Sequence, residues 1–91
     1  MKTLEELNNW RKRLIFRSWH RGTREMDLIM GSFADRNVSA FTESELAAYE
    51  TLLETPDPDL YNWIAGVETP PANLLTPMLE RFLSHRFQDV S

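Results

Sequence analysis

The sequence has no cysteine among its 91 residues, which excludes a disulfide framework and a thiolate metal site. It also has no apolar run near the roughly 18 residues that a membrane-spanning helix requires. Residues 1–6 contain two acids and no apolar core, so they resemble neither a secretory signal nor a typical transit peptide. We therefore expect a cytoplasmic protein that does not insert into a membrane.

Sequence motifs of the common catalytic and cofactor sites are also missing. There is no phosphate-binding glycine loop, no GxGxxG and no HxxxH pair, and His20 and His85 lie far apart in the sequence. Glu25 and Asp27 are two residues apart and would point to different faces of a helix, which makes them a poor acid/base pair. We expect no catalytic residue, no metal site and no tightly bound cofactor, and an enzyme that uses Glu25 as a base is the least favoured hypothesis.

No alternation of apolar and polar residues with period two appears, so strands are not expected. Apolar residues instead recur at helical spacing, which predicts helices over residues 3–20, 23–35, 42–54, 57–66 and 73–87. The fold class is therefore all-α, a single domain over residues 1–91 built as a small bundle of four to five short helices. One core should contain Leu14, Ile29, Phe33, Leu46, Tyr49, Leu53, Leu60, Trp63 and Ile64.

The ends of these helices carry recognisable signals. Thr23 is expected to cap the second helix, and Thr42 with Glu45 matches a capping box at the third. Asp57 and Pro58 are suited to the start of the fourth helix. Pro77 must lie in the first turn of the last helix or kink it. Residues 36–41 are expected to form a loop.

Charge is unevenly distributed along the chain. The net charge is −4, yet seven of the ten Lys and Arg residues fall within residues 1–25. Four of them, Arg11, Lys12, Arg13 and Arg17, are predicted to be exposed on the first helix. Such a basic patch suits nucleic acid or an acidic protein surface.

The stretch over residues 19–27 joins the first two helices and holds the strongest functional candidate. If it is helical, Arg21, Gly22 and Glu25 share one face, and glycine there costs about 1 kcal/mol relative to alanine. Glycine also lets another backbone come close, so this face is predicted to be a docking surface. The simpler alternatives are a helix break and an ion pair between Arg21 and Glu25. The candidate partner-binding residues are Arg11, Arg13, Arg17, Arg21, Gly22, Arg24, Glu25 and Asp27.

Two sequence blocks together carry a family resemblance. Residues 21–25 read RGTRE, and residues 52–63 read LLETPDPDLYNW, followed by Gly66 and a Pro70-Pro71 connector. With Arg13-Leu14 and Phe33, they resemble the RGxxE-motif FAD assembly factors of succinate dehydrogenase over roughly residues 10–75. His20 departs from the pattern, because members of that family often carry a second arginine there.

The resemblance implies a compact, usually monomeric, helical protein that promotes covalent attachment of FAD to the flavoprotein subunit of succinate dehydrogenase. In bacteria, the resemblance implies, the flavoprotein subunit of fumarate reductase is often served as well. The RGxxE surface would meet the flavoprotein, and FAD would be handled indirectly, since the bond forms to a histidine of the partner. Mitochondrial members carry an import sequence, and residues 1–6 do not resemble one. This chain is therefore expected in the cytoplasm of a bacterium.

An alternative of another class is a small helical nucleic-acid-binding or antitoxin-like regulator that uses the basic first helix. The overall pI of about 5.1 disfavours it. No recognition helix rich in Arg, Asn and Gln follows a tight turn either. The assembly factor is therefore the preferred hypothesis.

Overall fold

The computed structural model describes residues 2–85, and all regular structure within that range is helical. This confirms the all-α prediction. The five α-helices are α1 (Leu4–Trp19), α2 (Arg24–Asn37), α3 (Glu43–Leu53), α4 (Asp57–Ile64) and α5 (Pro77–Leu83), with single 3-10 turns η1 (Val38–Ala40) and η2 (Ala72–Leu74).

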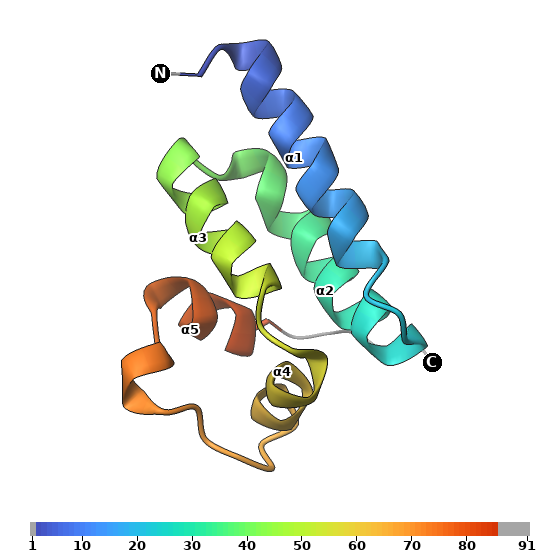
Figure 1. The fold of residues 1–91 in the computed structure, drawn as a ribbon, viewed down its shortest axis with the longest axis vertical. Helices are drawn as coiled ribbons and strands as arrows, with labels where there is room; N and C mark the ends of the chain where they lie inside the picture. The colour runs from blue at the N-terminus through green and yellow to red at the C-terminus, as the bar shows by residue number, and fades with distance from the viewer. Residues whose placement is uncertain (1, 86–91) are drawn as a thin grey trace.

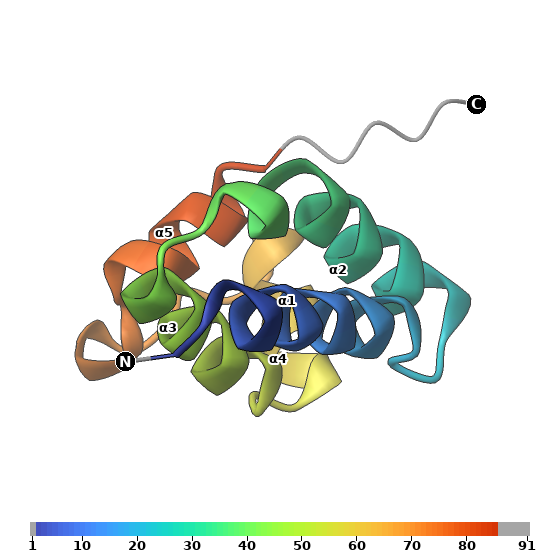
Figure 2. The same ribbon diagram turned by 90° about the horizontal axis from the view of Figure 1, so that it is seen from above.

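The two longest helices, α1 and α2, lie side by side and run in opposite directions (Figure 1). Helix α3 packs against α1, and α5 packs against α3 on the side away from it. Seen from above, α1 crosses the middle of the view, with α2 and α3 on either side of it (Figure 2). The connection between α1 and α2 is therefore at one end of this layer, next to the connection between α3 and α4.

Threonine side chains cap four of the five described α-helices, at Thr3, Thr23, Thr42 and Thr76, and two of these caps, Thr23 and Thr42, were predicted. The Thr23 side chain accepts a hydrogen bond from the Met26 backbone, and Thr42 forms a reciprocal capping box with Glu45. A second capping box, between Thr3 and Glu6, was not anticipated. In both boxes, backbone N–H donors hold the pKa of the glutamate below its ordinary value.

Boundary predictions were wrong in three parts of the chain. The expected loop at residues 36–41 instead continues α2 to Asn37 and then forms η1, because Val38 and Phe41 are drawn into the core. Helix α4 begins at Asp57 as predicted, but Pro56, not Asp57, occupies its N-cap position and forms no side-chain cap hydrogen bond, and the helix ends at Ile64, not at residue 66. The last helix begins at Pro77, not at residue 73, since proline fits the first turn and lacks the N–H that a later position needs. This helix ends at Leu83, so its predicted continuation over residues 84–85 is wrong, and residues 86–87 of the prediction lie outside the described residues.

Most of the predicted core is confirmed. Leu14, Ile29, Phe33, Leu46, Tyr49, Leu53 and Leu60 are buried in one cluster, whereas Trp63 and Ile64 are only partly buried at its edge. Aromatic rings form the centre, where Phe33 contacts Phe41, Tyr49 and Phe82 at centroid distances of 5.5–6.4 Å.

One polar group lies inside this core. The hydroxyl of Ser18, which is fully buried, is 2.7 Å from the carbonyl oxygen of Leu14 and 2.6 Å from the hydroxyl of Tyr49. Since a carbonyl can only accept, the single hydroxyl hydrogen of Ser18 goes to Leu14, and Tyr49 donates to Ser18. Burial raises the pKa of Tyr49 to about 12. This pair links α1 to α3 through the interior.

The close approach of α1 to α2 depends on a glycine that the sequence analysis did not single out. Gly31 of α2 lies flat against the Trp19 ring of α1, and a β-carbon at position 31 would overlap that ring. The indole nitrogen of Trp19 donates to Asp35 at 3.1 Å, which fixes the ring over the glycine. A small residue at this position thus sets the distance between the two helices.

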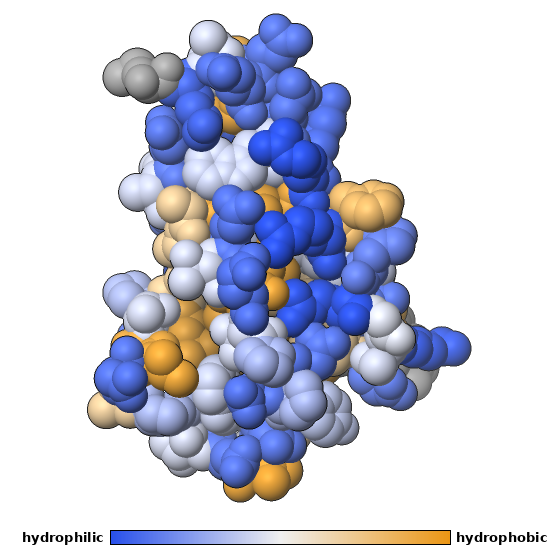
Figure 3. Space-filling view, viewed as in Figure 1, coloured by the Kyte–Doolittle hydropathy of each residue, from blue (hydrophilic) through white to orange (hydrophobic). Residues whose placement is uncertain are grey.

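Hydrophilic residues cover most of the face shown in Figure 3, including α1 and the adjacent side of α3. Apolar surface gathers instead over the segment that joins α4 to α5, where Leu74 and Leu75 are exposed. A hollow of about 260 Å³ lies beside it, lined by Leu52, Trp63 and Leu79 among others.

Candidate functional site

The RGxxE residues lie in a turn and in the first turn of a helix, not on one helical face. Helix α1 ends at Trp19 and α2 begins at Arg24, so Arg21 and Gly22 belong to the connection between them. Gly22 has a φ of +114°, a conformation that glycine adopts without strain and that a side chain makes costly. The predicted bend at Gly22 is thus confirmed, and the premise of a shared helical face is wrong.

The side chain of Arg21 turns inward, away from Glu25, and binds the connection between α3 and α4. Its Nε and Nη2 atoms lie 2.8 and 2.6 Å from a carboxylate oxygen of Asp57. Its Nη1 donates to the carbonyl of Leu53 at 2.7 Å, and Nη2 donates to that of Thr55 at 2.9 Å. Every guanidinium nitrogen therefore has a partner within the chain, and the side chain is only 12% exposed.

These contacts satisfy groups that a helix end normally leaves open. Leu53 is the last residue of α3, whose final carbonyls have no partner within the helix, and a cation there also complements the helix dipole. Asp57 is the first residue of α4, where a carboxylate is favoured by the opposite end of the dipole. A single arginine thus joins the end of one helix to the start of the next.

The backbone of the turn is held from the other side by Asp27 of α2. One oxygen of its carboxylate accepts hydrogen bonds from the backbone N–H of Arg21 at 2.6 Å and of Gly22 at 3.2 Å. The turn is therefore fixed both through its main chain and through the Arg21 side chain. We use the term brace for Arg21 together with Asp27 and Asp57.

Gly22, Arg24 and Glu25 remain at the surface once the brace is accounted for. Among the residues that the structure describes, no atom outside residues 21–23 lies within 4 Å of the place that a β-carbon on Gly22 would occupy, so that side of the turn is open to them. A shallow hollow of about 690 Å³ adjoins it, lined by Trp19, His20, Gly22, Thr23, Arg24, Asp27 and Leu28.

His20 and Phe16 form an exposed aromatic pair next to this turn. Their rings stack at a centroid distance of 3.9 Å, and Nδ1 of His20 lies 2.6 Å from the Phe16 carbonyl oxygen. Because the carbonyl can only accept, Nδ1 carries a hydrogen, and Phe16 is 61% exposed. Nothing in the sequence indicated this pair.

The basic patch on α1 is smaller than predicted. Arg17 is half-buried and forms ion pairs with Glu50 of α3 at 3.1 Å and with Glu54, the residue directly after α3, at 2.9 Å. Arg11 donates to the carbonyl of Phe41, so both residues contribute to packing between helices instead of being freely exposed. Of the candidates on α1, Arg13 is fully at the surface.

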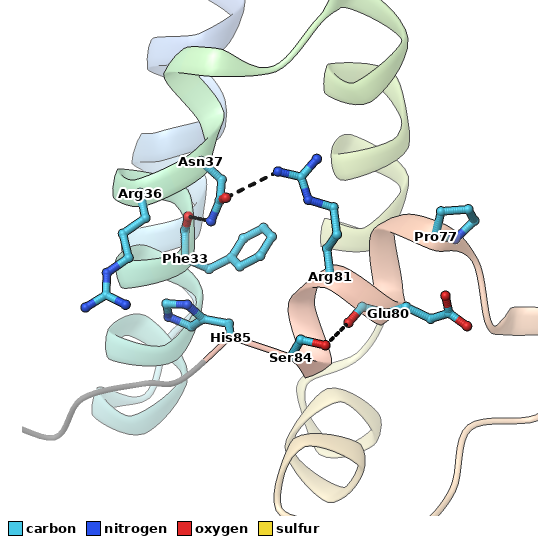
Figure 4. Close-up of a pocket in the computed structure, with 8 residues that line it drawn as sticks. All are labelled: Phe33, Arg36, Asn37, Pro77, Glu80, Arg81, Ser84 and His85. Atoms are coloured by element: carbon cyan, nitrogen blue, oxygen red, sulfur yellow. Dashed lines mark hydrogen bonds between the residues drawn. The ribbon is translucent and has the colours of Figure 1, made fainter.

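Another hollow, of about 590 Å³, lies between α2 and α5, away from the RGxxE turn (Figure 4). Arg81 extends across it and donates to Asn37 and to Glu45. His85 packs edge-on against Phe33 and hydrogen-bonds to Ser32, and its burial, together with the charge of Arg36, lowers the pKa of its imidazole. These contacts attach α5 to the neighbouring helices, so the hollow is accounted for as a groove along the interface between α2 and α5.

The described residues contain no group of three or more His, Asp or Glu side chains that could hold a metal ion. Over the same part of the chain, no helix has the length and apolar character to cross a membrane.

Comparison with known proteins places the chain in a family. A family model described as flavinator of succinate dehydrogenase matches residues 12–86. The chain is 44% identical over 73 residues to "FAD assembly factor SdhE" of Acetobacter pasteurianus, covering 80% of this chain and 67% of that protein. It is 37% identical over 68 residues to the protein of the same name in Legionella pneumophila, covering 75% and 85% respectively.

A eukaryotic relative is similarly close. "Succinate dehydrogenase assembly factor 2, mitochondrial" of Dictyostelium discoideum is 40% identical over 82 residues, which is 90% of this chain and 58% of the relative. The chain thus spans little more than half the length of that mitochondrial relative. The match to the family model covers most of the chain, including both sequence blocks that carry the resemblance. This chain belongs to the succinate dehydrogenase flavinator family.

Proposed function

We propose that this chain promotes covalent attachment of FAD to the flavoprotein subunit of succinate dehydrogenase, and that it docks on that subunit through Gly22, Arg24 and Glu25. The names of its relatives support the assembly role. The observation that carries the docking surface is the braced turn, which holds an open glycine beside an exposed cation and an exposed carboxylate. The bacterial relatives favour the cytoplasm of a bacterium as its location.

A helper of this kind needs no nucleophile of its own. Attachment requires FAD to be held against the accepting histidine of the flavoprotein, and a factor that binds one conformer of the partner raises the population of that conformer. Correct positioning then lowers the barrier of the reaction on the partner. We assign no catalytic residue to this chain, and FAD is bound by the partner. We infer that the factor acts as a monomer and that fumarate reductase is a second client.

Nucleic-acid binding loses its main support in the structure. The hypothesis required a basic first helix with free cations, whereas Arg17 of that helix is paired with two glutamates, and Arg21, in the connection after it, is paired with Asp57. Phosphate binding by those side chains would first have to break these ion pairs. Arg13 and Arg24, which are exposed, suit the steering of an acidic protein surface better.

The test is complementation of a bacterial strain that lacks its own factor. Covalent flavin is read as in-gel fluorescence of the denatured flavoprotein, for succinate dehydrogenase and for fumarate reductase separately. The wild-type chain should restore fluorescence, and Glu25→Ala should lower it at least tenfold. Glu43→Ala is the matched control, since Glu43 is also an exposed acid in the first turn of a helix. Equal fluorescence from the Glu25 and Glu43 variants would reject the docking surface.

A further inference from the structure

The RGxxE motif and the later DPDLYNW block are joined by direct contact. Arg21, from the first block, binds Asp57, from the second, across 36 positions of sequence. The same guanidinium donates hydrogen bonds to the carbonyls of Leu53 and Thr55, which lie at the end of α3. The shape of the turn therefore depends on the connection between α3 and α4.

We propose that the brace sets the conformation in which the turn meets its partner, and that Arg21 and Asp57 are positioning residues that do not themselves touch the flavoprotein. This proposal rests on the function proposed above. A guanidinium whose three nitrogens are all hydrogen-bonded, on a side chain only 12% exposed, has little left to offer a partner. The arginine of the motif thus acts through the fold, whereas Gly22 and Glu25 act at the surface.

Two features make the turn dependent on such support. Gly22 has a φ of +114°, and glycine can leave that conformation more easily than any other residue. The backbone N–H groups of Arg21 and Gly22 both point to one oxygen of Asp27, so a rotation at Gly22 would break at least one of these bonds. Without the contacts of the Arg21 side chain, the turn would adopt several conformations. The affinity for the partner would then fall in proportion to the fraction of molecules that have the binding-competent conformation.

The geometry also explains why arginine is needed at position 21. Lysine has three N–H donors, but all of them sit on one nitrogen, so it cannot reproduce the planar fork whose separate nitrogens reach Asp57, Leu53 and Thr55. Arg21→Lys should therefore behave like Asp57→Asn, although it keeps the positive charge. If Arg21 met the partner as a cation, lysine would preserve much of the binding.

The experiment compares Asp57→Asn with Asp59→Asn. Both remove one negative charge from the first turn of α4, but the side chain of Asp59 is exposed and lies outside the brace. Amide exchange of Gly22 is followed by NMR, and affinity for the purified flavoprotein subunit is measured by calorimetry. In Asp57→Asn we expect at least fivefold faster exchange at Gly22 and at least fivefold weaker binding, with wild-type values in Asp59→Asn.

Arg21→Lys should reproduce both effects, and combining it with Asp57→Asn should add little, because the two residues act as one unit. The proposal is overturned if Asp57→Asn binds like wild type while Arg21→Ala loses binding, since Arg21 would then contact the partner itself. Unchanged Gly22 exchange in Asp57→Asn would also overturn it. If instead the proposed function is wrong, the wild-type chain itself will not bind the flavoprotein. The amide exchange of Gly22 would still decide whether the brace holds the turn.

Discussion

The buried pair formed by Ser18 and Tyr49 allows a quantitative test of the packing between α1 and α3. In Ser18→Ala the Tyr49 hydroxyl keeps its burial but loses its acceptor, which costs about 1–3 kcal/mol. Alanine regains roughly 0.5 kcal/mol of helix propensity, so the net loss should be about 0.5–2.5 kcal/mol. For a domain of this size that corresponds to a fall in melting temperature of about 2–20 °C.

Tyr49→Phe should cost less, about 0.5–1.5 kcal/mol, because Ser18 still donates to the Leu14 carbonyl and leaves no donor unpaired. The double variant should be no less stable than Ser18→Ala alone, since removing Tyr49's hydroxyl also removes the orphaned group. Stabilities are measured by urea unfolding followed by circular dichroism, with equal m-values as the check that the unfolded state is unchanged. Additive losses in the double variant, or no loss in Ser18→Ala, would refute the hydrogen bond between the two hydroxyls.

Two further predictions concern the same core. Gly31→Ala should destabilise the chain by about 1–3 kcal/mol in thermal unfolding, because the added carbon overlaps the Trp19 ring; the gain of up to about 1 kcal/mol usual for an exposed helical glycine would contradict the close packing. In a Tyr61→Phe background, absorbance titration at high pH should report Tyr49 alone, with its pKa near 12. This pKa is raised above the unfolded value near 10. The contribution of Tyr49 to the free energy of unfolding is therefore complete below pH 10 and is lost as the pH rises toward 12. Ionisation of Tyr49 in the folded chain near pH 10 would show that the ring is not buried as described.

Local patterns in the sequence were enough to predict the helices. Threonine caps and periodic leucines depend on residues within one or two turns, so the starts of α2 and α3 and the burial of Leu14 and Leu46 could be predicted. The boundary errors arose where a distant contact overrides local preference. Phe41 looks like a loop residue until its contacts with Phe33 and Tyr49 are known, because these come from two other elements.

The candidate site shows the same limit more sharply. The motif letters identified the right stretch, and Gly22 was predicted to bend the chain. The direction of the Arg21 side chain could not be predicted, because its acceptors lie more than 30 positions away. Arg17 was predicted to be exposed for a similar reason, since its partners Glu50 and Glu54 lie in and directly after a different helix. Pairing between charges on separate helices leaves no trace in the periodicity of either one.

The brace links the maturation of the turn to synthesis of the second half of the chain. Helices α1 and α2 are neighbours in sequence and can pair as soon as both exist, since nearby segments close quickly. Arg21 must wait for Leu53, Thr55 and Asp57, which leave the ribosome last among its contacts. An unfinished or clipped chain therefore carries the motif without its final shape. On our proposal such a chain does not bind the flavoprotein, so binding takes place only after the factor has folded completely.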